Sequence, residues 1–307
     1  MPKVLIATVK PFAPIAVEQI KKIIENAGYQ FALLEKYENQ DDLKQAVADA
    51  DALIVRSDKI TADVIQAAPK LKIVVRAGAG YDNIDLKTAT EKGIVVMNTP
   101  GQNSNAVAEL ALGMMVYLAR NRFNGKPGTE LKGKSLGVHA YGHVGRRVAE
   151  IAKGFGMELF AFDPFIPKEE IEKDGVTVVD SAEELYTRSQ YVSLHIPANE
   201  QTIKSINYAL LSKMPQNATL VNTARKEIID EDDLLKMFEE RPDFKYISDI
   251  APDCKDVIAE KYPDRYFFTP KKMGAQTAEA NINAGLAAAR QIVNFFEKGD
   301  RTFQVNK

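Results

Sequence analysis

The sequence contains a single cysteine among its 307 residues, Cys254. One thiol cannot form a disulfide within the chain, which excludes the class of small secreted domains held together by disulfides. No uninterrupted apolar run approaches the roughly 18 residues that a membrane span requires. Met1-Pro-Lys leads directly into an apolar segment that is not typical of a signal peptide. These absences predict a cytoplasmic enzyme or binding protein.

Neither sign of charge is in excess, since 40 Lys and Arg residues are matched by 42 Asp and Glu residues. Such a chain has no overall field that would attract nucleic acid or an anionic membrane, so neither is expected as a partner. Apolar residues make up 45% of the chain and charged residues 27%, which is typical of a globular protein. A length of 307 residues suits about two domains, each with its own core.

Short apolar segments alternate with amphipathic ones along the whole chain. Strands are expected at 4–8, 29–34, 51–55, 71–75, 93–97, 135–140, 158–162, 176–179, 191–195, 218–221, 245–249 and 265–268. Helices are expected at 15–27, 41–48, 61–68, 85–92, 105–119, 144–156, 182–188, 203–213, 231–240 and 278–298. This alternation predicts parallel sheets covered by helices on both faces.

Residues 1–97 are predicted to form one α/β domain, and a second begins at Ser135. The helix at 105–119 is apolar nearly all round, so we expect it to be buried between domains or subunits. The last helix, 278–298, is expected to return to the first domain.

The turn after the strand at 135–140 carries Ala140-x-Gly142-x-x-Gly145, one substitution away from the G-x-G-x-x-G dinucleotide fingerprint. Backbone N–H groups at the start of the next helix can face a pyrophosphate there. Asp163 ends the next strand, about 20 residues past the glycines, where it would bind a ribose diol. The order of these elements predicts a dinucleotide site; the alternative is a glycine turn that binds nothing.

Ala140 is a departure from the fingerprint, because glycine normally makes the tight turn at this position. We expect alanine there to require negative φ. The glycines that approach the phosphates and the helix, Gly142 and Gly145, are both present. The substitution is therefore interpreted as a tolerated variant.

Polar residues follow several of the predicted strands, at the edge where doubly wound sheets bind ligands. They are Arg56-Ser57, Arg76, His195, Thr223-Ala-Arg225 and Asp249. A guanidinium binds carboxylate or phosphate through two hydrogen bonds, so three arginines at such positions suit a small anionic substrate. Taken singly, each arginine is more typical of a solvated surface charge.

These residues belong to longer motifs that resemble those of the D-2-hydroxyacid dehydrogenase family, and most of all its phosphoglycerate dehydrogenases. The motifs are Val55-Arg-Ser57, Arg76-Ala-Gly-Ala-Gly-Tyr-Asp-Asn-Ile-Asp85, Asn98-Thr-Pro-Gly-Gln-Asn-Ser-Asn-Ala-Val-Ala-Glu109, Tyr141-Gly-His-Val-Gly145, Asn222-Thr-Ala-Arg225 and Met273-Gly-Ala275. The resemblance implies an α/β fold of two doubly wound parallel-sheet domains. A Rossmann NAD-binding domain, 98–278, would be inserted in a flavodoxin-like substrate-binding domain, 1–97 and 279–307, with hinges near Asn98 and Ala278.

The resemblance also implies the site. Arg225 would bind the carboxylate or keto oxygen of the substrate, and other substrate contacts are implied for Arg56, Ser57, Arg76, Ala77, Gly78, Ala79 and Asn103. NAD contacts are implied for Tyr141, Gly142, His143, Val144, Asp163, His195, Ile196, Pro197, Thr202, Thr223, Ala224, Asp249 and Gly274. No metal ion is expected. A homodimer is expected, although the connector at 121–131, in a region that the family uses near its dimer interface, is shorter than usual. The chain ends without the regulatory domains of longer relatives, so control by serine is not expected.

The family's catalytic glutamate and histidine are both replaced. Cys254 takes the place of the glutamate, and Lys271 or Lys272 that of the histidine, with Lys272 favoured by alignment on Met273-Gly274. An ammonium can donate the proton that reduction of a keto acid requires. Oxidation requires a neutral amine, which a nearby arginine, the other lysine and burial would favour and a glutamate would oppose. Loss of both family residues together therefore indicates a changed proton carrier.

The resemblance implies NAD-dependent oxidation of D-3-phosphoglycerate to 3-phosphohydroxypyruvate, the entry to serine biosynthesis. The alternative on the same fold is a glyoxylate or hydroxypyruvate reductase, or another D-2-hydroxyacid dehydrogenase. A second alternative is a non-enzymatic, NAD-sensing protein similar to the corepressors of the family. Preference for a phosphorylated substrate distinguishes the phosphoglycerate dehydrogenase from the other dehydrogenases and reductases. Turnover of any substrate distinguishes these enzymes from the NAD-sensing protein.

Overall fold

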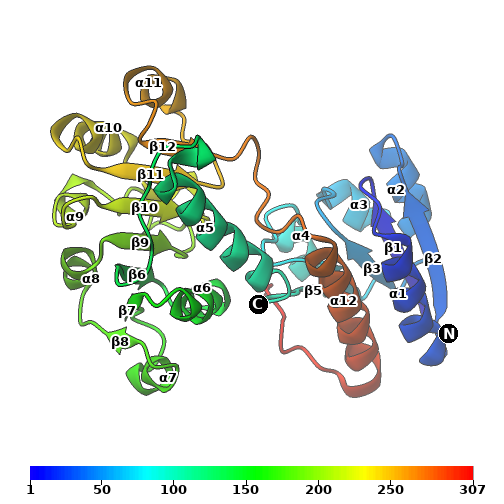
Figure 1. Ribbon diagram of the computed structural model, residues 1–307. Helices are drawn as coiled ribbons and strands as arrows, with labels where there is room; N and C mark the ends of the chain where they lie inside the picture. The colour runs from blue at the N-terminus through cyan, green and yellow to red at the C-terminus, as the bar shows by residue number, and fades with distance from the viewer. Residues whose placement is uncertain (307) are drawn as a thin grey trace. The chain divides into compact units, whose positions relative to one another are not determined.

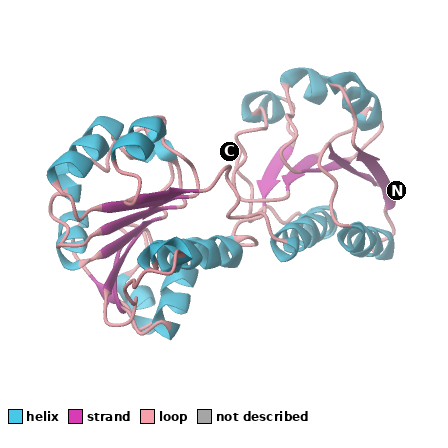
Figure 2. Ribbon diagram, turned by 45° about the horizontal axis from the view of Figure 1, so that its top comes forward, coloured by secondary structure: helices cyan, strands magenta, loops and turns pink. Residues whose placement is uncertain are grey.

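Residues 1–306, which the computed structural model describes, form two compact units. Unit 1 comprises Met1–Asn103 together with the C-terminal segment from Gln276, and unit 2 comprises Ser104–Ala275. Each unit contains one parallel sheet with helices on both faces (Figures 1 and 2). The predicted fold class is confirmed.

The sheet of unit 1 has five strands in the order β2-β1-β3-β4-β5, the flavodoxin-like order. Its strands are β1 (Lys3–Thr8), β2 (Gln30–Glu35), β3 (Ala52–Val55), β4 (Ile73–Arg76) and β5 (Val95–Asn98). Its helices are α1 (Pro14–Asn26), α2 (Gln40–Val47), α3 (Ala62–Gln66), α4 (Leu86–Glu91) and α12 (Ala278–Lys298). The central strands are apolar runs because both of their faces are buried under helices.

The last helix and the segment after it are tied to β5. Gln291 of α12 donates from Nε2 to the carbonyl of Asn98 at 3.0 Å. Farther on, the N–H of Val305 donates to the carbonyl of Val96 at 2.9 Å. The side chain of Asn306 accepts from the Val96 N–H at 2.7 Å and donates to another backbone carbonyl of this region. The C-terminal segment thereby covers the edge strand of the sheet.

The sheet of unit 2 has seven strands in the order β12-β11-β10-β9-β6-β7-β8, which contains the Rossmann order. Its strands are β6 (Ser135–His139), β7 (Glu158–Phe162), β8 (Thr177–Val178), β9 (Tyr191–Leu194), β10 (Thr219–Asn222), β11 (Lys245–Ser248) and β12 (Tyr266–Phe268). Its α-helices are α5 (Ser104–Ala119), α6 (His143–Gly154), α7 (Lys168–Lys173), α8 (Ala182–Arg188), α9 (Tyr208–Leu211), α10 (Glu231–Glu240) and α11 (Lys255–Lys261). Two short 3-10 turns lie at Asn121–Phe123 and Lys226–Ile228.

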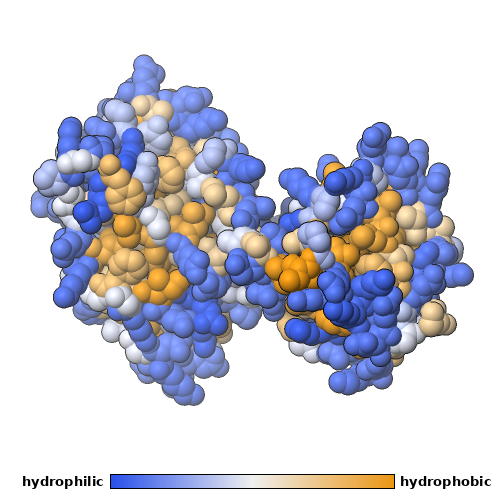
Figure 3. Space-filling view, turned by 45° about the vertical axis from the view of Figure 1, so that its right-hand side comes forward, coloured by the Kyte–Doolittle hydropathy of each residue, from blue (hydrophilic) through white to orange (hydrophobic). Residues whose placement is uncertain are grey.

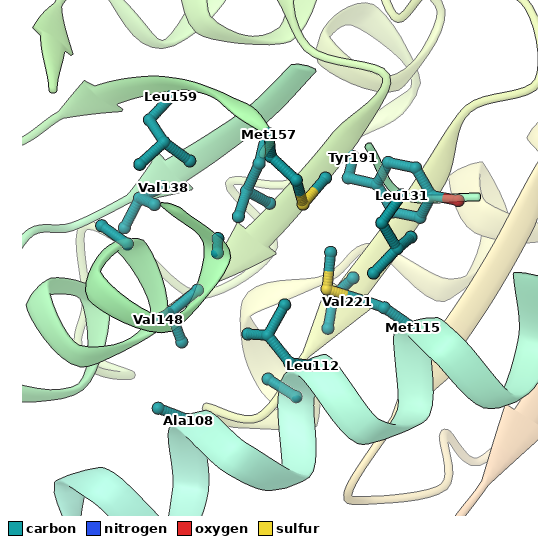
Figure 4. Close-up of a cluster of buried hydrophobic side chains, with 14 of the residues drawn as sticks. Ala108, Leu112, Met115, Leu131, Val138, Val148, Met157, Leu159, Tyr191 and Val221 are labelled. Atoms are coloured by element: carbon teal, nitrogen blue, oxygen red, sulfur yellow. The ribbon is translucent and has the colours of Figure 1, made fainter. Parts of the chain in front are cut away.

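Helix α5 packs into the core of its own unit. Ala108, Leu112 and Met115 lie in one buried cluster with Val148 of α6 and Val221 of β10 (Figure 4). Most of this helix is therefore buried within unit 2, and a contact of its remaining face with another subunit stays a prediction. Its apolar composition reflects contacts with both α6 and the sheet inside unit 2.

The segment 203–213 is the clearest error in the predicted elements. Only Tyr208–Leu211 is helical, and the Asn207 side chain caps this turn by accepting from the Leu210 N–H. Before it, Lys204 has a positive φ of 55°, and its N–H donates to Glu227 at 2.9 Å. These preceding residues are thus bonded to the segment before α10 and cannot continue a helix.

Within residues 1–306, no helix combines the length and the apolar character that crossing a membrane requires.

Candidate active site

The turn between β6 and α6 is shaped to receive an anion. Gly142 is the N-cap of α6, and no side chain of the described residues caps this end of the helix. The first N–H groups of the helix therefore remain available to a ligand. Gly145 permits the close packing of the helix on the turn, because a Cβ there would lie 2.2 Å from the carbonyl oxygen of Ala140.

Ala140 has a φ of +75°, so the expectation that alanine here requires negative φ was wrong. Two contacts hold the residue in this conformation. Its N–H donates to the carbonyl of Phe162 at 2.9 Å, and its own carbonyl lies against the α-carbon of Gly145. The turn therefore keeps the geometry of the glycine fingerprint at a conformational cost of about 1–2 kcal/mol.

Asp163 directly follows β7, and its carboxylate holds the same turn. Oδ2 accepts from the Tyr141 N–H at 2.7 Å, and Oδ1 accepts from the N–H groups of Phe165 and Ile166 at 2.8 and 3.3 Å. A carboxylate has about four acceptor positions, so one remains for a hydroxyl of a ribose. Asp163 therefore has a structural role, and its ligand role stays a prediction with which these bonds are compatible.

His195 directly follows β9, and one of its two ring nitrogens is without a hydrogen-bond partner in the described residues. Its Nδ1 lies 3.4 Å from the hydroxyl of Thr223, whereas Nε2 is buried and has no partner within residues 1–306. Burial, together with the neighbouring His139, lowers the pKa of His195 to about 3, so the ring is neutral. An orphaned buried nitrogen is a position that a polar ligand atom can satisfy. Beyond it, the Thr202 hydroxyl donates to the Pro197 carbonyl and closes the turn after Ile196.

Two cations of unit 2 share one acceptor, the carbonyl oxygen of Ala224. Arg225 donates to it from Nη1 at 3.0 Å, and Lys272 donates from Nζ at 3.2 Å. The two nitrogens therefore lie no farther apart than the sum of these distances. Asn222, which ends β10, fixes this loop, since its side chain accepts from the Ala224 N–H and donates to the Arg225 carbonyl, both at 2.9 Å.

The loop that carries Lys272 is bonded to Asp249 at the end of β11. The carboxylate of Asp249 accepts from the N–H groups of Met273 and Gly274 at 2.9 and 2.8 Å. Lys271 makes no comparable hydrogen bond in the part of the chain that the structure describes. This geometry places Lys272, rather than its neighbour, beside Arg225.

Cys254, at the family's glutamate position, is half-buried just before α11. Its N–H donates to Glu231 at 2.8 Å. Burial raises the pKa of the Cys254 thiol to about 12, and the negative charge of Glu231 adds to the effect. The thiol is therefore protonated at neutral pH and is not a base.

In unit 1, Arg56 directly follows β3, but its guanidinium donates hydrogen bonds to other residues of the same unit. Nη1 donates to the carbonyls of Lys10 and Pro11 at 2.9 and 3.0 Å, and Nη2 donates to the Asn281 side chain of α12. The group also lies over the ring of Phe12, 5.1 Å from its centre. Arg56 therefore connects the loop after β1 to α12. These bonds leave fewer N–H groups of its guanidinium available to a substrate.

Arg76, the last residue of β4, lies against the loop that follows it. Its Nε donates to the Arg56 carbonyl at 3.1 Å, and a Cβ on Gly78 would lie only 1.3 Å from Arg76 Nη1. Gly78 has a φ of +151°, and the N–H groups of Ala77 and Gly78 already donate to Val55 and Arg76. In the described residues, Ala79 is thus the one of the three whose N–H lacks a partner.

The two other predicted substrate residues of unit 1 are open to solvent. Ser57 is exposed, and Asn103 is partly exposed at the end of the unit. Ser57 also lines a pocket of about 400 Å³ at the carboxyl ends of β1, β2 and β3, together with Lys10 and Lys59. This pocket brings two further cations near a predicted substrate residue.

Three residues of these loops were missed by reasoning from sequence. Asn222 is buried and braces the Arg225 loop, and Glu231 accepts from two N–H groups beside Cys254. Phe165, two residues past Asp163, is 85% exposed. The Asn222-Thr-Ala-Arg225 motif was a signal for the first, and an aromatic residue two positions past the carboxylate predicted to bind ribose was a signal for the third.

Comparison with known proteins agrees with this geometry. The family described as D-isomer specific 2-hydroxyacid dehydrogenase, catalytic domain, matches residues 5–306. The D-3-phosphoglycerate dehydrogenase of Methanocaldococcus jannaschii is 40% identical over 278 residues, covering 82% of this chain and 51% of the relative. The hydroxypyruvate reductase of Thermotoga maritima is 36% identical over 274 residues, covering 82% of this chain and 87% of the relative.

A comparison with solved structures gives a match that covers a larger share of both chains. The NAD⁺-bound 3-phosphoglycerate dehydrogenase of Entamoeba histolytica is 49% identical, with a TM-score of 0.87, and the match covers 100% of this chain and 99% of that one. By contrast, the present chain spans about half the length of the curated phosphoglycerate dehydrogenases that it matches, such as those of M. jannaschii and Synechocystis. The family match nevertheless extends over nearly all of the sequence. The chain therefore belongs to the D-isomer specific 2-hydroxyacid dehydrogenase family.

Proposed function

We propose that the chain catalyses the NAD-dependent oxidation of D-3-phosphoglycerate to 3-phosphohydroxypyruvate, with Lys272 as the proton carrier. The observation that carries the proposal is the meeting of Arg225 and Lys272 at the Ala224 carbonyl, in the unit that contains the dinucleotide turn. The 49% identity to an NAD⁺-bound 3-phosphoglycerate dehydrogenase supports both the substrate and the cofactor.

The residues of unit 2 fit NAD. The N-terminus of α6 would hold the pyrophosphate, Asp163 a ribose, and Nε2 of His195 a polar atom of the cofactor. The charge of Asp163 would oppose a 2′-phosphate, so NAD is favoured over NADP. When bound, NAD supplies the hydride acceptor. The remaining chemistry belongs to the side chains of this chain.

Oxidation of the substrate removes a hydride from carbon and a proton from the hydroxyl oxygen. Arg225 would bind the carboxylate and the developing keto oxygen through its guanidinium. The neutral amine of Lys272 would take the hydroxyl proton, and in the reverse direction the ammonium would return it. Arg225 lies within a few ångströms of Lys272, whose side chain is exposed, so both cations can face the same anionic substrate.

A second candidate is the reduction of hydroxypyruvate or glyoxylate on the same site. The observation that favours it is that the guanidinium of Arg56 already donates hydrogen bonds to Lys10, Pro11 and Asn281. An arginine held in this way contributes less to binding a phosphate. The hydroxypyruvate reductase of T. maritima is also matched over most of its length.

The test is turnover by the purified protein with a panel of 2-hydroxy and 2-keto acids and each nicotinamide cofactor. The proposal expects D-3-phosphoglycerate and NAD to give the highest kcat/KM. Preference for hydroxypyruvate or glyoxylate over the phosphorylated acid would support the second candidate instead. NADH binding without turnover of any acid would refute both and would support the cofactor-sensing alternative.

We also propose a homodimer in the cytoplasm. Leu110, Val116 and Tyr117 of α5 are partly exposed, and Phe123 is 65% exposed just after it. Figure 3 shows an apolar area on the visible face of unit 2 among hydrophilic side chains. Apolar surface of this kind is typical of a protein interface. Analytical ultracentrifugation of the protein and of a Phe123→Asp variant tests the dimer.

A further inference from the structure

Within residues 1–306, the two sheets have four edge strands, and three of these are protected. At β5, the outward-facing N–H and carbonyl of Val96 are both bonded to the C-terminal segment. At β12, the guanidinium of Arg122 donates to the outward-facing carbonyl of Tyr266. Strand β8 has only two residues, and very short edge strands offer little for another strand to pair with. The remaining edge strand, β2, has six residues.

The backbone groups of β2 face alternately towards β1 and away from the sheet. The N–H groups of Gln30 and Lys36 donate to carbonyls on the β1 side at 2.9 and 3.1 Å, so the even-numbered residues face β1. The outer edge of β2 therefore consists of the N–H and carbonyl groups of Phe31, Leu33 and Glu35. In the part of the chain that the structure describes, β2 pairs with no strand except β1. These six groups are thus open to a further strand.

The outer edge of β2 lacks the features that commonly prevent such pairing. Lysine, proline and bulges protect many edge strands. Between Gln30 and Glu35 the sequence is Phe-Ala-Leu-Leu, without charge or proline, and the ladder with β1 continues through all six residues without a bulge. Leu33, in the middle, is 42% exposed. Figure 1 shows β2 at the outer side of unit 1.

We propose that the outer edge of β2 binds the same edge of a second copy of this chain, antiparallel to it about a two-fold axis at Leu33. Leu33 then lies opposite the partner's Leu33, and Phe31 lies opposite the partner's Glu35. In this register all six outward groups of each copy form hydrogen bonds. The five-stranded sheets of the two copies become one continuous sheet.

The backbone selects this register among those close to it. A shift that places even-numbered residues opposite odd-numbered ones would set outward groups against inward ones. The next allowed register, centred on Ala32, would place Tyr29 opposite the partner's Glu35. The N–H of Tyr29 is already bonded, however, since it donates to the Ile24 carbonyl at 3.1 Å. Only the register centred on Leu33 uses all six open groups.

The side chains of β2 suit a second copy. Lys36 lies opposite the partner's Gln30, and Glu35 lies opposite the partner's Phe31, so no like charges face each other. At the axis, the two exposed Leu33 side chains cover each other. The strand is therefore complementary to itself in charge and in apolar surface.

Cysteine cross-linking tests the register. In a Cys254→Ser background, which removes the single native thiol, Leu33→Cys places two thiols opposite each other. The α-carbons of such a pair lie about 5.5 Å apart, within the range of about 4.4–6.8 Å that a disulfide spans. The control is Lys92→Cys, exposed just after α4 at the β5 end of the sheet. We expect roughly tenfold more cross-linked dimer with Leu33→Cys, because pairing raises the effective concentration of the thiols. Equal cross-linking of the two variants would overturn the proposal.

Leu33→Lys tests the association without a covalent bond. It places two lysines face to face across the axis, and the fold should be kept because position 33 is 42% exposed. Sedimentation is measured in a Phe123→Asp background, so that the dimer proposed above through α5 does not hide this contact. We expect a dimer whose Kd rises roughly tenfold or more when Leu33→Lys is added. A dimer that Leu33→Lys leaves unchanged, or monomers at every concentration before it is added, would contradict the pairing.

Amide hydrogen exchange identifies the partner. The N–H groups of Phe31, Leu33 and Glu35 should exchange more slowly as the concentration of the protein rises. The N–H of Lys36, which is bonded towards β1, should exchange at the same rate throughout. Exchange of the three outward N–H groups that stays fast at every concentration, or that slows only when a different protein is added, would refute pairing with a second copy.

Discussion

Replacing Ala140 by glycine tests the geometry of the dinucleotide turn. The φ of Ala140, +75°, lies in the left-handed region, which costs a residue with a Cβ about 1–2 kcal/mol. Glycine removes this strain. It also lowers the free energy of the unfolded chain by about 0.4–1 kcal/mol, because the unfolded backbone gains conformational freedom. We therefore expect Ala140→Gly to raise the free energy of unfolding by about 0.5–1 kcal/mol. For a domain of the size of unit 2, this raises Tm by about 1–4 °C.

Differential scanning calorimetry is the suitable assay, because a chain with two units need not unfold in one step. Lys204→Gly is the matched substitution, since Lys204 also has positive φ, and it too should raise Tm. Ala152→Gly is the opposite control, because Ala152 is buried within α6, where glycine costs about 1 kcal/mol. A loss of stability in Ala140→Gly equal to that in Ala152→Gly would refute the inference that the backbone of Ala140 is strained. NADH affinity should be unchanged by Ala140→Gly.

Three further predictions concern side chains. Lys272→Ala should lower kcat by roughly 10²–10⁴-fold with little effect on NADH affinity, and Lys271→Ala should have a much smaller effect; equal losses in single-turnover experiments would contradict the assignment. Arg56→Ala should lower Tm in calorimetry, because it leaves the carbonyls of the loop after β1 without their donor, and an unchanged Tm would show that the bonds contribute nothing. Burial lowers the pKa of His139 to about 4, against about 6.5 when unfolded, so the stability that it contributes is present above pH 6.5 and is lost as pH falls towards 4. The loss is on the order of 3 kcal/mol, and His139→Leu should reduce the pH slope of the urea-unfolding free energy over this range and leave the slope due to His195; an equally steep slope would contradict the shift.

The predicted strands agree with the structure because strands buried on both faces are apolar runs, as at β3 and β4. The segment 203–213 also has apolar residues at helical spacing, yet most of it is not helical. Its conformation depends on hydrogen bonds to residues 227 and 228, and local periodicity carries no information on such partners. The same limit explains Ala140, whose φ is held by contacts with Phe162 and Gly145.

At the site, the sequence identified which residues end the strands but not what their side chains contact. Arg56 was predicted to bind substrate, whereas its guanidinium is bonded to residues 45, 46 and 225 positions away in the chain. Asp249 was predicted as a cofactor contact, which stays a prediction, and its carboxylate also accepts from two N–H groups of its own chain. In both cases the residue type and position are compatible with two roles. Long-range hydrogen bonds give each residue a structural role that only the folded structure shows, and the predicted ligand roles stay predictions.

The hydrogen bonds between the C-terminal segment and β5 have a consequence for biosynthesis. A ribosome releases residues 1–103 long before Val305 and Asn306, which cover the edge of their sheet. Residues 104–275 are continuous in the chain and can fold as soon as they emerge. The N-terminal part must meanwhile persist with an open strand edge, a state that is prone to pairing with other nascent chains. Production of this protein is therefore expected to depend on the speed of translation and on chaperones that shield β5 until Val305 and Asn306 arrive.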